Sequence, residues 1–309
     1  MGILVVGSVA FDSVKTPFGE APEILGGSAT YFSMAASFFT EVSLVGVVGD
    51  DFGNEHVRLL STKGIDLRGL ERVPGKTFRW AGEYSYDLNN RTTLDTQLNV
   101  FADFKPRIIP EYQTLEYVFL GNIDPTLQRD VLRQIRKPVL VGCDTMNFWI
   151  ERQYDSLIET LKFVDILVIN DGETRELARE SNLIKAARKI QALGPRTVVI
   201  KRGEYGVLMF NDGLWFSAPA FPLEDVFDPT GAGDSFAGGF MGYLAAARGL
   251  DAAYLKKAII FGSVMASFNV EEFGVNRLTR LTYPEVIERY RQFKALTHFE
   301  DLGNDLCRS

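Results

Sequence analysis

DPTGAGDSFAGGF, residues 228–240, combines a proline, a Gly-Ala-Gly turn and a run of small and apolar residues at helical spacing. This pattern predicts a loop that leads into the N-terminus of a helix. The first turn of a helix has backbone N–H groups without intrahelical partners and the positive end of the helix dipole, so it attracts anions. Gly231 and Gly233 have no Cβ and therefore allow a ligand to approach the backbone closely.

Asp234 adds a negative charge where an anion would bind. One interpretation is a capping aspartate in a glycine-rich turn. The other is a general base, because a carboxylate beside an anion site can take the proton of a hydroxyl during phosphoryl transfer. In that second interpretation Asp234 is catalytic, and the N–H groups of Gly231, Ala232 and Gly233 stabilise the transferring phosphoryl group.

The stretch 228–240 closely resembles the C-terminal signature of the PfkB, or ribokinase-like, family of sugar and nucleoside kinases. The segments 46–53 (GVVGDDFG) and 170–173 (NDGE) are similar to further motifs of this family, and 26–31 and 144–149 are similar only loosely. The resemblance implies an ATP-dependent kinase that transfers the γ-phosphoryl group to a hydroxyl of a sugar. A nucleoside (adenosine-like) kinase is the alternative, and a non-catalytic nucleotide-binding regulator is less favoured.

Composition limits the partners that we expect. The chain has 309 residues and a formal net charge of −7, and no basic run stands out, so a nucleic-acid partner is not expected. Its two cysteines form no CxxC pattern, which fits a reducing cytoplasm. The apolar run at 3–6 is too short for a signal or membrane segment. We expect a cytoplasmic protein with a small-molecule acceptor and no membrane partner.

Strand and helix patterns alternate from residue 117 onward. Short apolar runs at 117–120, 138–141 and 166–169 are each followed by helical spacing, which predicts a mostly parallel sheet covered on both faces. With the resemblance, this predicts an α/β fold of ribokinase-like type: three layers, α/β/α, in one kinase domain over 1–309, with a small β-sheet lid.

The lid is expected mainly from about 12–25 and 75–104. In 75–104, aromatic residues alternate imperfectly and show no helical period, which predicts a small antiparallel sheet. The segment 18–25 shows no regular pattern. A solvated hairpin is the alternative to a lid, and the aromatic residues either line a pocket or pack a homodimer through the lid.

The acceptor site is expected near the first strand. The run 3–9 predicts a buried strand that places Asp12 just beyond its carboxyl end, where open α/β sheets bind ligands. The resemblance assigns Asp12, with Gly26 and Gly27, to the acceptor. The family usually has asparagine where this chain has Tyr31, whose ring either stacks on a base or fills volume.

The nucleotide site is expected at the ends of later strands. Asn170 and Glu173 match the family's Asn-x-x-Glu motif, which implies that Glu173 organises Mg²⁺ and the phosphates through water; a helix cap is the alternative. Lys201 is a candidate phosphate contact or only a surface charge. Gly203 and Gly206 would allow the nucleotide to approach the backbone.

The cofactors that the resemblance implies are ATP and Mg²⁺. In several family members Asp228 and Thr230 help to bind a monovalent cation such as K⁺, and a loop that here contains Gly274 flanks the adenine. This loop diverges in the present chain, so the sequence leaves K⁺ dependence open. Met146 and Phe148 replace the asparagine and arginine of another family motif, which weakens the case for an active-site role of their segment.

Overall fold

The computed structural model describes residues 2–89 and 91–300. Nine strands form its central sheet: β1 (Gly2–Val6), β4 (Glu41–Val48), β5 (Ile65–Arg72), β8 (Tyr117–Leu120), β9 (Leu140–Asp144), β10 (Ile166–Asn170), β11 (Thr197–Lys201), β12 (Val207–Asn211) and β13 (Leu214–Ala218). Their order is β13-β12-β11-β10-β9-β8-β1-β4-β5. The strands from β11 to β5 pair in parallel, and β12 and β13 add an antiparallel edge.

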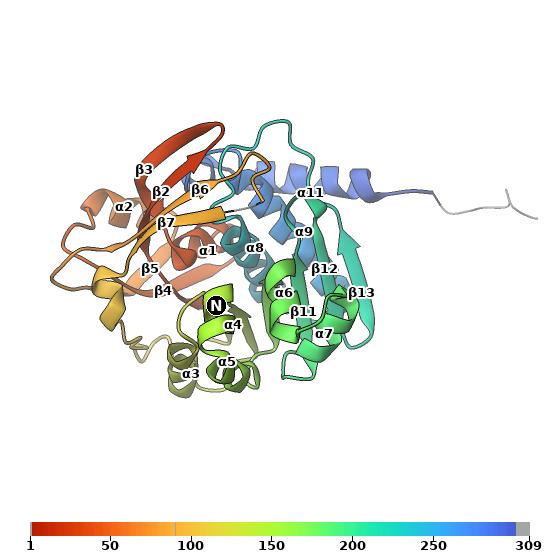
Figure 1. The fold of residues 1–309 in the computed structure, drawn as a ribbon, viewed down its shortest axis with the longest axis horizontal. Helices are drawn as coiled ribbons and strands as arrows, with labels where there is room; N and C mark the ends of the chain where they lie inside the picture. Colours follow the sequence, from red (N-terminus) through yellow and green to blue (C-terminus); the bar gives the residue numbers. More distant parts are fainter. Residues whose placement is uncertain (1, 90, 301–309) are drawn as a thin grey trace, which may run out of the picture.

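Helices cover both faces of this sheet (Figure 1). Successive residues of β1 enter different cores, because side chains of a strand alternate between its faces: Ile3 and Val5 join one core, and Leu4 and Val6 join the other. The first core includes residues of α1 (Ser28–Ala36), α2 (Asn54–Thr62), α8 (Ala232–Ala247), α9 (Ala252–Asn269), α10 (Asn276–Arg280) and α11 (Tyr283–Thr297). The second includes residues of α3 (Pro125–Gln134), α4 (Asn147–Arg152), α5 (Tyr154–Leu161), α6 (Asp171–Ala178) and α7 (Leu183–Gln191). The predicted three-layer α/β/α class is confirmed.

A second sheet contains β2 (Ala10–Thr16), β3 (Gly19–Gly26), β6 (Phe78–Tyr84) and β7 (Arg91–Gln97), in the order β3-β2-β6-β7. It lies at the upper left of Figure 1, in red and orange. The outer pairs are antiparallel, which confirms the antiparallel pairing expected within 75–104, and the inner pair of β2 and β6 is parallel. These two strands are far apart in sequence and are joined by a long crossover, which parallel pairing requires.

Other details of the strands also differ from the prediction. The central strand β1 ends at Val6, so Asp12 lies within β2 of the small sheet instead of following the first strand. The segment 18–25, which shows no regular pattern in the sequence, is mostly β3. The strand β5 was missed because its buried and exposed residues do not alternate regularly.

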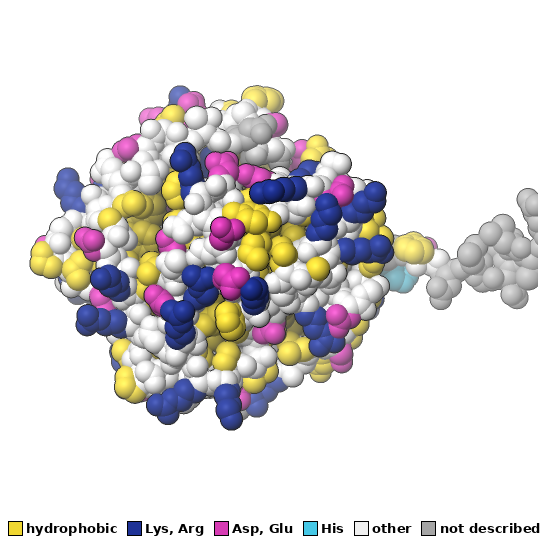
Figure 2. All heavy atoms as spheres, turned by 60° about the horizontal axis from the view of Figure 1, so that its bottom comes forward, with side chains coloured by type: hydrophobic (Ala, Val, Ile, Leu, Met, Phe, Trp, Pro, Cys, Tyr) yellow, Lys and Arg dark blue, Asp and Glu magenta, His cyan; other side chains and the backbone are white. Residues whose placement is uncertain are grey.

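The surface is mixed in character. Figure 2 shows one face on which basic, acidic and apolar side chains are interspersed. Within residues 2–89 and 91–300, no helix combines the length and the apolar composition that a membrane crossing requires.

Candidate active site

The turn before α8 forms as the glycines of the signature predict. Gly231 is the N-cap residue, and its φ of +75° lies in the left-handed region that favours glycine. A Cβ on Gly231 would lie 2.3 Å from the ring of Tyr31, so a larger residue does not fit. The Ala232 N–H donates to the Pro229 carbonyl (3.1 Å) and is already engaged. The Ala232 N–H is therefore not available to an anion at this helix end, which leaves the amides of Gly231 and Gly233 as candidates.

A buried lysine lies against the same turn. The Lys201 side chain, at the end of β11, is only 18% exposed, and its Nζ lies 3.6 Å from Asp144 Oδ2. A Cβ on Gly233 would lie 2.7 Å from the same Nζ. Lys201 is therefore no free surface charge, and its ammonium adds positive charge beside the first turn of α8.

Asp234, in this first turn, has an environment suited to proton transfer. Burial raises the pKa of Asp234 to about 7, and the negative charge of Asp144 acts in the same direction, whereas Lys201 and Arg91 oppose both effects. A carboxylate with a pKa near 7 can hold or release a proton at neutral pH, which is the range that a general base needs.

Asp144 and Arg91 are two charged residues that the sequence-based assignment left out. Asp144 ends β9 and is 6% exposed, and Arg91 begins β7 of the small sheet. Strands β9, β10 and β11 are parallel neighbours, so their carboxyl ends meet at one edge. Asp144 follows the apolar run 138–141, and this position could have indicated a site residue. Met146 and Phe148 replace two residues of the family motif in the same segment, which weakened that prediction. Arg91 carried no comparable signal.

Asn170 and Glu173 form a capping box at the start of α6. The Glu173 N–H donates to Asn170 Oδ1 (2.8 Å), and the Asn170 N–H donates to Glu173 Oε2 (3.0 Å). Asn170 pairs in register with Lys201, which brings the cap to the edge that carries the lysine. Burial, followed by the charge of Asp144, raises the pKa of Glu173 to about 7. The capping interpretation describes the observed contacts. The Glu173 carboxylate also lies close enough to Asp144 and Lys201 for their charges to affect its pKa.

The residues at this edge fit a weakly anchored Mg²⁺. Among the described residues, no group of three or more His, Cys, Asp or Glu side chains forms a ready-made metal cage. Mg²⁺ commonly keeps several waters and takes one or two carboxylates together with substrate phosphates. A single partly buried carboxylate, Glu173, near the ammonium of Lys201 and the N-terminus of α8 is compatible with that mode of binding.

On the acceptor side, the structure brings together Asp12, Gly26, Gly27 and Tyr31. A Cβ on Gly26 would lie 2.0 Å from Asp12 Oδ2, so the carboxylate packs directly on this glycine. Burial raises the pKa of Asp12 to about 7, although the Gly27 N–H donates to its carboxylate and opposes the shift. The Tyr31 hydroxyl lies 3.5 Å from Asp12 Oδ2. Because the Tyr31 ring also touches Gly231, the acceptor side adjoins the turn before α8.

The small sheet contacts both parts of the site. On β6, the Tyr84 hydroxyl accepts a hydrogen bond from Thr230 Oγ1 (3.2 Å) in the turn before α8. Between β6 and β7, Asn89 Nδ2 donates to Glu204 Oε1 (3.0 Å) in the turn after β11. This second turn contains Gly203, at φ +54°, and ends at Gly206, at φ +80°.

Asp228, Thr230 and Gly274 form a separate buried group. The Gly274 N–H donates to Asp228 Oδ2 (3.0 Å), and the Thr230 N–H donates to Asp228 Oδ1 (2.8 Å). Burial raises the pKa of Asp228, and these hydrogen bonds oppose the shift. The structure thus places Gly274 beside the turn before α8.

An aspartate and a buried lysine lie at the N-terminus of a helix, an arrangement that can accept a proton and bind a phosphate group. The model of the pfkB family of carbohydrate kinases matches residues 11–280. The chain therefore belongs to the PfkB family of carbohydrate kinases, whose members phosphorylate hydroxyl groups of sugars or nucleosides. The expectations of a kinase and of this family are confirmed.

Individual relatives support the same assignment. The chain is 31% identical to the cytidine kinase of Thermococcus kodakarensis over 260 residues, which are 81% of this chain and 91% of that protein. It is 33% identical to the deoxyribokinase of Salmonella typhi over 294 residues, 88% and 87% of the two chains. The crystal structure of Methanocaldococcus jannaschii nucleoside kinase, a ribokinase-family member, superposes with a TM-score of 0.75 over 94% of this chain and 99% of that chain, at 21% identity. The fold is ribokinase-like.

Proposed function

We propose that this kinase transfers the γ-phosphoryl group of ATP to a hydroxyl of a sugar, with Asp234 as the general base. The observation that carries the proposal is the position of Asp234 at the anion-attracting end of α8, beside the buried ammonium of Lys201. Asp234 can accept a proton there while Lys201 and the N-terminus of α8 bind a phosphate group.

The proposed step is a single displacement. The acceptor oxygen forms a bond to the γ-phosphorus, the bond from that phosphorus to the oxygen of ADP breaks, and the hydroxyl proton passes to the Asp234 carboxylate. The amides of Gly231 and Gly233 and the ammonium of Lys201 stabilise the negative charge of the transferring group. Ala232 contributes through the helix dipole, because its N–H is engaged.

We assign the rest of the nucleotide to the edge formed by β10 and β11. Lys201 faces the phosphates, Asn170 and Glu173 lie beside them, and the turn of Gly203 and Gly206 lies next to the nucleotide. The positive φ of both glycines shapes this turn, and a Cβ on either would meet Asn89 or Ala218. Mg²⁺, when bound, neutralises the phosphate oxygens, and we assign Glu173 to it through water.

The acceptor binds, in this proposal, to the Asp12 carboxylate, which packs on Gly26 and accepts the N–H of Gly27. A buried carboxylate accepts hydrogen bonds from sugar hydroxyls strongly. The Tyr31 ring is 1% exposed and packs against Gly231, so it fills volume and is not placed to stack on a base. This burial favours a sugar acceptor.

A nucleoside acceptor is the second candidate, and two observations favour it. The cytidine kinase of Thermococcus kodakarensis is 31% identical to this chain. The small sheet also carries two exposed aromatic side chains, Phe18 (51% exposed) and Tyr86 (82% exposed), whose ring centroids lie 6.4 Å apart. In a nucleoside kinase these two rings, and not Tyr31, would stack on the base.

A homodimer through the small sheet remains a prediction. Strand β7 lies at the edge of that sheet and is exposed along its length. An edge strand has backbone groups that can pair with a second chain.

The test is ADP release with Mg·ATP against a panel of ribose, deoxyribose, fructose, cytidine and adenosine. Release that depends on a sugar supports the primary proposal, and release that depends only on a nucleoside supports the second candidate. ADP release equal to the acceptor-free rate with every compound, by a protein that binds ATP, would contradict both and favour a regulatory role.

A further inference from the structure

The oxygens expected to ligate a monovalent cation already have partners within the protein. Both carboxylate oxygens of Asp228 accept backbone N–H groups, from Thr230 and from Gly274. The Thr230 carbonyl accepts a hydrogen bond from the side-chain amide of Asn269 (2.7 Å). A bound K⁺ needs several oxygens that replace its hydration shell. Within the described residues, the buried side-chain nitrogen and oxygen atoms without partners lie elsewhere. The three oxygens are already engaged, and a cation would have to compete with these hydrogen bonds.

Asn269 connects the two halves of the catalytic turn. It is fully buried at the last residue of α9, and its Nδ2 donates to the Thr230 carbonyl while its Oδ1 accepts from Ser235 Oγ (3.0 Å). Thr230 precedes the Gly-Ala-Gly turn, and Ser235 follows Asp234. One side chain therefore fixes the backbone on both sides of the proposed base.

The loop after α9 adds to the contacts by which Asn269 holds the turn. The Val270 carbonyl accepts the N–H groups of Phe227 (2.9 Å) and Asp228 (3.3 Å), and Gly274 holds the Asp228 carboxylate. These bonds place the loop directly against the chain that enters the turn. A shift of the loop would move the turn, and displacements of about 1 Å can reduce catalysis about 100-fold.

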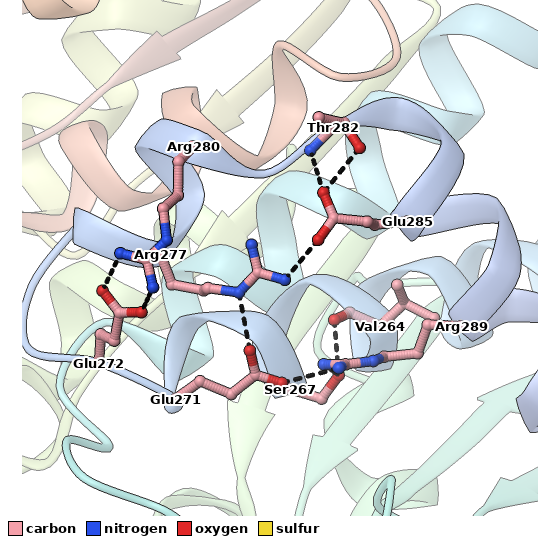
Figure 3. Close-up of polar contacts among 9 residues, drawn as sticks. All are labelled: Val264, Ser267, Glu271, Glu272, Arg277, Arg280, Thr282, Glu285 and Arg289. Atoms are coloured by element: carbon pink, nitrogen blue, oxygen red, sulfur yellow. Dashed lines mark hydrogen bonds and ion pairs between the residues drawn. The ribbon is translucent and has the colours of Figure 1, made fainter.

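Arginines supply positive charge where this loop leaves α9. Glu271 binds Arg277 Nε (2.8 Å) and Arg289 Nη2 (2.7 Å), as Figure 3 shows. The guanidinium groups of Arg289 and Arg277 lie 3.5 Å and 4.8 Å from the ring centroid of Phe268. Cations near the C-terminus of a helix stabilise it, and stacking on an aromatic ring adds to this. These ion pairs and ring contacts hold the loop after α9 in place without a bound cation.

We propose that Asn269 is a positioning residue for phosphoryl transfer, and that Asn269 and the arginine-held loop fix the turn before α8 without a monovalent cation. The enzyme is therefore not activated by K⁺. The inference rests on the proposed function, because the turn in question carries Asp234.

The first test compares wild-type protein in K⁺ and in tetramethylammonium at matched ionic strength. The expected kcat is the same in both salts, within about twofold, because salts of equal ionic strength screen the surface charges of the protein equally. A K⁺-specific increase of about tenfold or more would overturn the proposal. Thermal unfolding in the same two salts gives a readout that does not need turnover: equal melting temperatures support the inference, and a K⁺-specific rise contradicts it. If no acceptor is phosphorylated, the proposed function fails, and the melting temperatures still decide the inference.

The second test uses Asn269→Asp, which keeps the shape but cannot donate to the Thr230 carbonyl. In tetramethylammonium, kcat should fall about 10- to 100-fold with little change in ATP affinity, as for the loss of a positioning group. K⁺ should restore part of the rate, because the new carboxylate and the released carbonyl can ligate it. The matched control is Arg280→Ala, which removes an exposed pair with Glu272 that is separate from the contacts of Asn269 and Glu271, and it should leave kcat unchanged. An Asn269→Asp enzyme with the wild-type kcat would contradict the proposal, and if this variant does not fold, the wild-type comparison decides.

Discussion

The turn before α8 and the outer strand of the small sheet differ sharply in how they are held. In the turn, Asp228 and Thr230 are buried, and backbone amides and the Asn269 side chain bind their oxygens. Every residue of β7, by contrast, is exposed. The small sheet as a whole contacts the turn, since Thr230 Oγ1 donates a hydrogen bond to the Tyr84 hydroxyl of β6.

This difference separates two tasks of a kinase. Phosphoryl transfer requires reacting groups held within a fraction of an ångström, which a buried and fully hydrogen-bonded turn can provide. Acceptor recognition can rest on an exposed sheet, whose surface residues change at little cost in stability. We therefore expect substitutions in the turn to abolish transfer, and substitutions of the exposed aromatic residues at the small sheet to change only the acceptor.

The largest effect is expected for Gly231→Ala. A Cβ at this position meets the Tyr31 ring at 2.3 Å and adds strain at φ +75°, so turnover should fall more than about 100-fold and the melting temperature should drop. The measurement is kcat with thermal unfolding. Gly213→Ala is the matched control, because Gly213 has φ +83° with no atom within 4 Å of the added Cβ. Equal kcat values for the two variants would show that the turn before α8 does not have to be held more precisely than an exposed turn.

A somewhat smaller effect is expected for Lys201→Met. The substitution removes the ammonium from the anion site and leaves Asp144 buried without its ion pair, so kcat should fall about 10²- to 10³-fold and stability should decrease. Steady-state kinetics and thermal unfolding measure both. Lys162→Met, which removes only an exposed pair with Glu159, is the control. Wild-type kcat in Lys201→Met would refute the assigned phosphate contact.

The pH dependence should report the raised pKa of Asp234. A general base acts only when ionised, and below its pKa of about 7 the carboxyl is protonated. We therefore expect kcat/KM to be constant above about pH 7 and to fall at least about tenfold for each pH unit below it, because Asp12 and Glu173, whose pKa values are also about 7, are protonated over the same range. A profile that stays flat down to pH 5, at constant ATP saturation, would contradict the role of this carboxylate.

The smallest effect is expected for Tyr86→Ala on the small sheet. With a sugar acceptor, kcat and KM should stay close to those of the wild type. With a nucleoside acceptor, loss of a stacking ring should raise KM about tenfold, because stacking on an aromatic side chain contributes about 1–3 kcal/mol per base. Phe163→Ala, which truncates another exposed aromatic side chain, is the control. A large decrease in kcat with a sugar would show that the small sheet also takes part in transfer.

Local sequence was sufficient for the parts of the site that form from neighbouring residues. The glycine turn, the start of α8 and the capping box of Asn170 and Glu173 each depend on contacts within a few positions. The alternation of apolar strands and helices likewise predicted the parallel sheet, because burial on both faces leaves a clear pattern.

Long-range packing explains what the sequence did not reveal. Whether Tyr31 stacks on a ligand or fills the core depends on Gly231, which is 200 positions away in the chain. Asp144 meets Lys201 only because two strands end at one edge of the sheet. The parallel pairing of β2 with β6 has no local signal either, since both strands come from distant segments.

The most direct test of the central claim is the turnover of Asp234→Asn with saturating Mg·ATP and the best acceptor. The asparagine keeps the size of the side chain but cannot take the proton. We predict ATP affinity close to that of the wild type and a kcat at least about 100-fold lower. A kcat within a few-fold of the wild-type value would show that Asp234 is not the base.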